Sequence, residues 1–79
     1  MTKEQIIGIE EKLNYILRRS DRLEERIDQA EADGDTDKLY RYEKKDERYL
    51  GMIEGIDFVL ARIGYVTKWQ DGKFVVVER

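Results

Sequence analysis

Arginines and lysines at helical spacing are the residues of this chain best suited to bind a ligand. They form two groups: Arg18, Arg19, Arg22 and Arg26, then Arg41, Lys44, Lys45 and Arg48. Guanidinium and ammonium groups bind phosphates and carboxylates, so converging groups would form an anion site. Acidic residues are interleaved with both groups, however, and we expect mainly a solvated surface of weak ion pairs. On this reading an anion site requires arginines from two chains to converge.

The segment EADGDTD, residues 31 to 37, concentrates acidic side chains and suggests calcium. A calcium loop of the EF-hand type, counted from Asp33, requires Gly at its sixth position and Glu at its twelfth. Lys38 and Lys44 occupy those positions. We therefore predict no metal site, and we interpret the acids as residues that favour a helix N-terminus through its dipole.

The sequence lacks most of the residues that usually carry out catalysis. The chain contains no Cys and no His, and Ser20 is its only serine. A serine is a weak nucleophile unless an adjacent base activates it. We therefore predict a protein that is not an enzyme, binds no cofactor and acts only by binding.

Length and composition restrict the class of protein. The 79 residues allow one domain, residues 1–79, and 42% of them are charged while the formal net charge is only −3. A nucleic-acid binder normally has a basic excess, and a membrane span needs about 20 apolar residues. We expect a cytoplasmic protein that binds neither nucleic acid nor membrane.

Two long helices are expected, at about 3–32 and about 36–63. Thr2 and Gln5 match a capping box at the start of the first, and Gly34 suits a left-handed helix end. Apolar residues in both segments recur at alternating steps of three and four, which is the pattern of a coiled-coil seam. In the second segment this seam includes Ile56 and Ile63. A short turn between them predicts an antiparallel helical hairpin.

Each seam has one polar break, at Ser20 and at Asp46. Pairing positions whose numbers sum to about 69 brings the breaks near each other, with Ser20 opposite Tyr49 and Asp46 opposite Leu23. Arg19 and Arg26 flank this layer and could pair with Asp46. We interpret the layer as a device that fixes the register of the helices.

A β-hairpin is expected at about 65–78, where the period of the pattern changes to two. Asp71-Gly72 between β-rich runs predicts a type I′ turn. The resulting register pairs Trp69 with Phe74, Thr67 with Val76, and Tyr65 with Glu78. An isolated hairpin is marginal in water, so one face must dock on the helices. The predicted fold is mainly α, with an antiparallel two-helix coiled-coil hairpin followed by this short C-terminal β-hairpin.

The apolar surface of the helices is wider near the chain termini than two helices need. The residues outside the seam there form a candidate oligomer interface: Ile7, Leu17, Leu50, Met52, Gly55, Phe58 and Val59. Glycines inside a helix, at positions 51 and 55, suggest close approach of another backbone or ring. We expect a homodimer or higher oligomer to complete the fold, and the outer edge of strand 74–77 offers a further place for pairing across chains.

The stretch from about 34 to 65 has a Gly-Asp turn and a terminal pattern I-E-G-x-x-F-x-L-x-x-x-G-Y. The matching residues are Gly34, Asp35, Ile53, Glu54, Gly55, Phe58, Leu60, Gly64 and Tyr65. In these residues the chain resembles small helical-hairpin accessory proteins of bacteriophages and prophages of Gram-positive bacteria. The resemblance implies no catalytic residues. It implies a protein that binds and blocks a host component, including antiviral defence systems.

Three functions are consistent with these features. The first is stoichiometric inhibition of a host process, most of all antiviral defence, by protein binding. The second is an oligomer that sequesters a small anionic, nucleotide-like signal molecule, and the third is a structural oligomerisation unit. The candidate partner-binding residues are aromatic or basic: Tyr65, Trp69, Phe74, Arg18, Arg22, Arg41 and Arg48. The aromatic ones could instead dock on the helices, which would leave the arginine-bearing faces as the contact surface.

Overall fold

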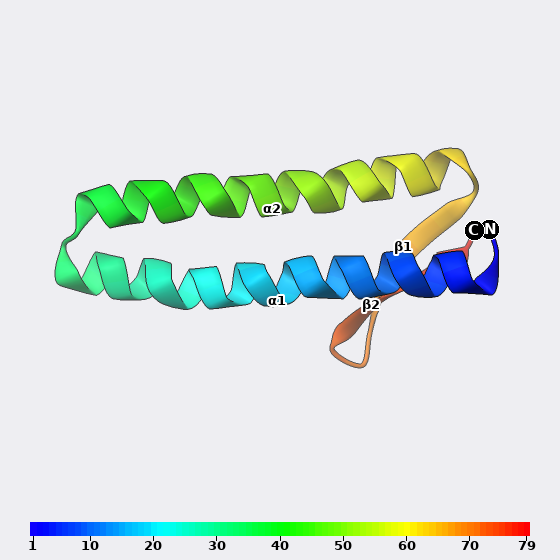
Figure 1. The fold of residues 1–79 in the computed structure, drawn as a ribbon, viewed down its shortest axis with the longest axis horizontal. Coiled ribbons are helices and arrows are strands. Elements are labelled where there is room, and N and C mark those ends of the chain that lie inside the picture. Colours follow the sequence, from blue (N-terminus) through cyan, green and yellow to red (C-terminus); the bar gives the residue numbers. More distant parts are fainter.

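The computed structural model describes all residues from 1 to 79. Its elements follow in the order α1 (Lys3–Asp33), α2 (Thr36–Arg62), β1 (Tyr65–Gln70) and β2 (Lys73–Glu78). The helices lie side by side in an antiparallel hairpin, and the strands form an antiparallel β-hairpin near the chain termini (Figure 1). The structure confirms the predicted fold class.

Local sequence signals determine where the helices begin and end. The Thr2 hydroxyl accepts a hydrogen bond from the Gln5 backbone N–H at 3.1 Å, and the Gln5 side chain accepts one from the Thr2 N–H at 2.8 Å. Gly34 ends α1 with a φ of 68°, a conformation that glycine adopts without steric cost. Asp35 then caps α2, since its carboxylate accepts from the Lys38 N–H at 3.1 Å.

The turn of the β-hairpin has the predicted type I′ character. Asp71 and Gly72 both have positive φ, 53° and 78°. This turn matches the right-handed twist of the strands and fixes their register. Trp69 therefore pairs with Phe74, and Thr67 with Val76, as the sequence predicts.

The β-hairpin packs on the helices through the face that carries Tyr65. This side chain and Val76 of β2 form the core together with Leu13 of α1 and Leu60 of α2. Strand β2 contacts α1 and β1 contacts α2. The strands run obliquely to the helices, and the hairpin tip extends beyond α1 (Figure 1). The structure is therefore a pair of helices with a small sheet covering one side of the terminal half.

Side chains of α1 satisfy the outer edge of β2. The Asn14 amide donates to the Phe74 carbonyl at 3.0 Å and accepts from the Phe74 N–H at 2.8 Å. The Val76 N–H donates to the Glu10 carboxylate at 2.9 Å. The edge that we expected to be free for pairing with another chain is thus already occupied, because its polar groups are partly buried against α1 and need partners there.

The polar layer between the helices is one direct contact. The Ser20 hydroxyl donates to the Asp46 carboxylate at 2.6 Å, so the two breaks face each other rather than Tyr49 and Leu23. No arginine pairs with Asp46, because the only ion pairs in the chain are Lys38–Asp35 and Lys44–Glu47. The buried Ser20 hydroxyl, and not an arginine, is the hydrogen-bond partner of the half-buried Asp46 carboxylate.

Candidate functional site

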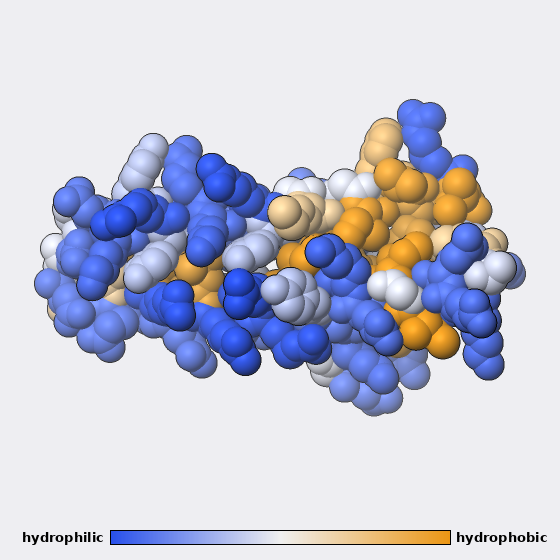
Figure 2. Space-filling model, in the orientation of Figure 1, coloured by the Kyte–Doolittle hydropathy of each residue, from blue (hydrophilic) through white to orange (hydrophobic).

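The side of the helix pair away from the β-hairpin changes character along its length. Positions seven apart lie on nearly the same face of a helix. On α2 such a series reads Lys38, Lys45, Met52 and Val59, from basic near the turn to apolar near the termini. Figure 2 shows the same division, with a hydrophilic half over the turn and apolar residues gathered over the terminal half, mainly along α2, while hydrophilic residues continue along α1. This side therefore offers two different binding surfaces.

The basic half of this side contains two adjoining depressions. The smaller, about 80 Å³, lies between the helices and is lined by Arg19, Arg22, Leu23, Arg26, Lys45 and Tyr49. The larger, about 680 Å³, is lined by Lys38, Tyr40, Arg41, Tyr42, Lys44, Lys45 and Arg48 of α2. Lys45 belongs to both, and no carboxylate lines either one. We call the cations facing this side, Arg19, Arg22, Arg26, Lys38, Arg41, Lys45 and Arg48, the basic surface.

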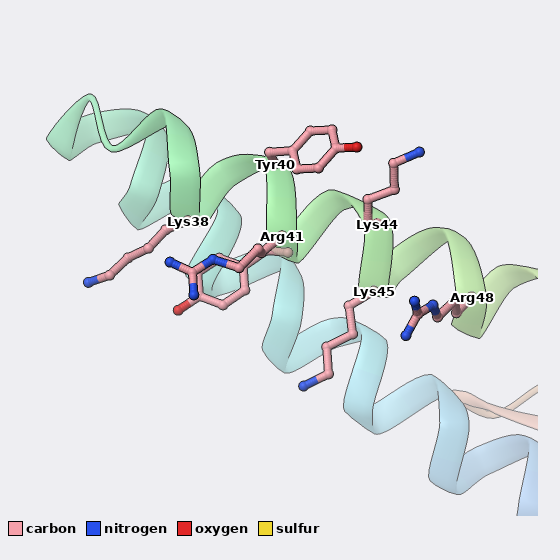
Figure 3. Close-up of a pocket in the computed structure, with 7 residues that line it drawn as sticks. Lys38, Tyr40, Arg41, Lys44, Lys45 and Arg48 are labelled. Atoms are coloured by element: carbon pink, nitrogen blue, oxygen red, sulfur yellow. The ribbon is translucent and has the colours of Figure 1, made fainter.

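Figure 3 shows how α2 contributes to the basic surface. Lys38, Arg41 and Lys45 extend from the same side of the helix, and Arg48 continues their row toward the middle of α2. Tyr40 and Lys44 extend from the opposite side of the helix in the same view. Several cationic groups are therefore presented in one direction, which a single extended anionic partner can contact together.

Of the ion pairs expected among these cations, Lys38 forms one with Asp35 and Lys44 forms one with Glu47, whereas no arginine is paired. Both ion pairs in the chain join residues three positions apart, at 3.9 and 3.8 Å, and neither includes an arginine. The acids of α1 lie elsewhere: Asp21 and Asp28 fall seven and fourteen positions after Asn14, which contacts β2. They therefore face the sheet side. Arg19, Arg22 and Arg26 are therefore separated in space from Asp21 and Asp28, whereas Arg18 lies on the sheet side beside Asp21.

A third depression, of about 600 Å³, lies between α1 and the β-hairpin. Its walls include Ile7 and Leu17 of α1, with Arg18 at their side, and Trp69 and Phe74 of the hairpin. The two rings are in edge-to-face contact, with centroids 5.2 Å apart and an interplanar angle of 81°. Trp69 remains 59% exposed, so it is available as a contact residue.

The structure separates the candidate partner-binding residues. Tyr65 is buried in the core, so its ring supports the fold and is not a contact surface. Trp69, Phe74 and Arg18 line the depression between α1 and the hairpin. The others belong to the basic surface: Arg22, Arg41 and Arg48.

The candidate oligomer residues likewise fall on more than one surface. Ile7 and Leu17 line the depression beside Trp69, and Phe58 lies under the Arg62 guanidinium at 5.0 Å. Asp57 faces the sheet, because its carboxylate accepts a hydrogen bond from the Thr67 hydroxyl of β1 at 2.7 Å. Leu50 lies seven positions before Asp57 and therefore faces the same side.

Only Met52, Gly55 and Val59 share one stripe of α2, spaced three and four apart. The same spacing adds two residues that the sequence analysis placed in the seam, Ile56 and Ile63. Ile63 is 53% exposed, so it does not belong to the seam. Ile56 meets Ile9 of α1 in a further depression of about 490 Å³. We call Ile9, Met52, Ile56, Val59 and Ile63 the apolar surface.

The helix glycines have no packing role inside the chain. A Cβ atom added at Gly8, Gly51 or Gly55 would meet no atom within 4 Å. The close approach expected at positions 51 and 55 is therefore not made by this chain itself. Gly55 lies seven positions after Arg48. This face of α2 therefore carries an arginine at the middle of the helix and no side chain one heptad later, beside the apolar surface.

No protein-family model, curated protein or solved structure matches this chain. Neither helix combines the length and the apolar character that crossing a membrane requires. The functional proposal therefore comes from the chemistry of these surfaces. Their arrangement can bind anionic groups through the basic surface and apolar groups through the apolar surface and the Trp69 depression.

Proposed function

We propose that this chain is a non-enzymatic, phage-type accessory protein that inhibits a process of a bacterial host by stoichiometric binding. The basic surface contacts an acidic region of a host protein in the host cytoplasm, and the first process to test is antiviral defence. The observation that carries the proposal is the segregation of charge. Arginines and lysines of both helices line two adjoining depressions without a carboxylate, in a chain of net charge −3.

Like charges held together reduce stability, so a folded chain that keeps them has another use for them. Arg22 has Arg18, Arg19 and Arg26 at helical spacings of three or four. Arginine forms bidentate bonds with carboxylates and is enriched among the residues that dominate protein interfaces. A charged surface also accelerates association with a partner of opposite charge. These properties suit an inhibitor that acts by occupancy.

The test is expression of the protein in bacteria that carry a defence system and are challenged with phage. Wild type should restore phage growth, and the charge-reversed variant Arg22→Glu/Arg41→Glu should not. The control Lys68→Glu/Lys73→Glu changes net charge equally on the exposed β-hairpin and should act like wild type. Capture from host lysate with the same variants should recover a host protein only with wild type and the control. Equal activity of both double variants would contradict the proposal.

A second candidate function is sequestration of a small anionic signal molecule. The specific support is the smaller depression, where Arg22 and Arg26 of α1 meet Lys45 and Tyr49 of α2. We expected such a site to require two chains, but the two helices of one chain form this depression. Its volume of about 80 Å³ equals roughly two to three water molecules, which suits one phosphate group and not a whole nucleotide. Mass analysis of small molecules released from protein purified from infected cells distinguishes this function from protein binding.

A further inference from the structure

The apolar surface is an exposed patch that the chain itself does not cover. Met52 is 51% exposed, Val59 is 59% exposed and Ile63 is 53% exposed. Ile9 and Ile56 line a depression on the same side. Figure 2 shows apolar residues gathered over the α2 part of the terminal half. Large contiguous patches of this kind are uncommon on monomeric proteins and mark interaction sites.

We propose that a second copy of this chain covers the apolar surface, in a two-fold dimer whose helices run antiparallel and overlap only in their terminal halves. The inference is independent of the proposed function, because it uses a different half of the molecule. Near an axis through Ile56, Met52 of one copy packs against the partner's Val59. Terminal halves of both helix pairs then form a four-helix core.

The distribution of charge selects this arrangement. A dimer with parallel helices would place one basic surface directly over the other, which like charges oppose. A full antiparallel overlap would cover each apolar surface with a basic one and leave apolar side chains against charges. The half overlap places the apolar residues of α2 against their counterparts and directs the two basic surfaces to opposite ends of the dimer. Gln5 and Lys12, which line the same depression as Ile9 and Ile56, are the polar residues that this interface has to accommodate.

The available area is sufficient for such a dimer. The molecule extends 47 × 23 × 17 Å, and Figure 2 views it down the shortest axis. Half of the 47 × 23 Å outline is on the order of 500 Å² per copy, so the dimer can bury up to about 1,000 Å², the lower limit for a biological interface. Gly8 and Gly55 adjoin the apolar surface and have open space above them, so the two copies can approach closely.

The first experiment measures the mass of the full chain by light scattering at about 100 µM. Wild type should have twice the mass of the 9.5 kDa chain. Val59→Glu should be monomeric, whereas Phe58→Glu, at an equally exposed neighbour outside the apolar surface, should remain a dimer. A monomeric wild type overturns the proposal, and so does equal dissociation of both variants. Circular dichroism of both variants establishes that each is folded.

The second experiment tests the overlap, and it uses the absence of native cysteine. Gly55→Cys lies near the axis and should form a disulfide between copies on mild oxidation. Arg41→Cys lies in the basic half and should not. Cross-linking at both positions, or only at the second, overturns the antiparallel half overlap. Arg22→Glu/Arg41→Glu should still dimerise, so loss of inhibition and loss of dimerisation are separable.

Discussion

The Ser20 hydroxyl donates a 2.6 Å hydrogen bond to the Asp46 carboxylate, and this contact is the one polar layer between helices that otherwise pack apolar side chains. Ser20 is buried while Asp46 is half-buried. The bond therefore forms in a partly desolvated setting, where losing one partner costs more than the net value of the bond itself. It also links positions on two helices that could otherwise slide past each other.

Ser20→Ala should lower the free energy of unfolding by about 1–3 kcal/mol, because it leaves the Asp46 carboxylate without its partner. Ser20→Ala/Asp46→Leu should recover most of that loss, since replacing both polar partners by apolar ones removes the desolvation cost. Urea denaturation followed by circular dichroism measures both. If the single variant is as stable as wild type, the layer does not hold the register of the helices.

Asn14→Ala should destabilise the docking of the β-hairpin by about 1–3 kcal/mol, because the Phe74 N–H and carbonyl both lose their partner. Glu11→Ala is the matched control, since Glu11 is exposed on the same helix and has no hydrogen bond to the sheet. Its effect should stay within about 0.5 kcal/mol. Hydrogen exchange at the β-hairpin amides should accelerate for Asn14→Ala alone. Equal exchange in the two variants would show that the edge of β2 is held by other contacts.

Tyr65→Ala should destabilise the fold by roughly 3–5 kcal/mol, because this ring is 7% exposed and packs between the helices and β2. Trp69→Ala should cost less than about 1 kcal/mol, because Trp69 is 59% exposed. Thermal unfolding of the two variants side by side is the measurement. Similar melting temperatures would mean that the two aromatic residues contribute equally to the core.

The elements and their local geometry were predictable because short-range chemistry determines them. The Thr2–Gln5 capping box, Gly34 and Asp71-Gly72 each act within a few residues, so helix ends and the hairpin register follow from the sequence. Which face of the hairpin docks was not predictable, because both faces carry apolar residues. The docked face carries Tyr65 and Val76. The hairpin is held there by contacts such as Asn14 with the Phe74 carbonyl, which joins residues 60 positions apart.

The site was only partly predictable. The arginines of the basic surface were identified, but their interleaved acids suggested neutralising pairs that do not form. Spacings of seven in the sequence already indicate which residues share this side of the helix pair. Lys38, Lys45, Met52 and Val59 follow one face of α2, which contains no acidic residue in this series. The apolar surface was missed in part because Ile56 and Ile63 fit the seam pattern, and only packing shows that Ile63 remains exposed.

Gly55→Ala and Gly51→Ala should each stabilise the monomeric fold by up to about 1 kcal/mol, because both sites have open space and glycine is a poor helix former. The two sites differ in position, since only Gly55 adjoins the apolar surface. Gly55→Leu should therefore weaken self-association, whereas Gly51→Leu should not. Sedimentation of both leucine variants tests this difference. If neither changes the association constant, close approach at Gly55 is not required.

Arg22→Glu should raise the stability of the chain at low ionic strength. Arg22 has three arginines at helical spacings of three or four, namely Arg18, Arg19 and Arg26. The substitution converts three repulsive relationships into attractive ones and makes one attractive relationship, with Glu25 three positions away, repulsive; each is worth about 0.2–0.5 kcal/mol on an exposed helix. We therefore expect a net gain of roughly 0.4–1 kcal/mol in 10 mM salt. The gain should be much smaller in 500 mM salt, where the Debye length falls to a few ångströms. Thermal unfolding across this range measures the difference.

Lys68→Glu is the control, because this exposed lysine lies on the β-hairpin away from the arginines, and its effect on stability should be small at every salt concentration. Two results together would show that the chain keeps an unfavourable cluster of charge for binding. Arg22→Glu would be more stable than wild type, and Arg22→Glu/Arg41→Glu would no longer inhibit the host process. If Arg22→Glu is instead less stable than wild type at low salt, the arginines are held by favourable contacts within the chain, and the reason for assigning them to a partner is removed.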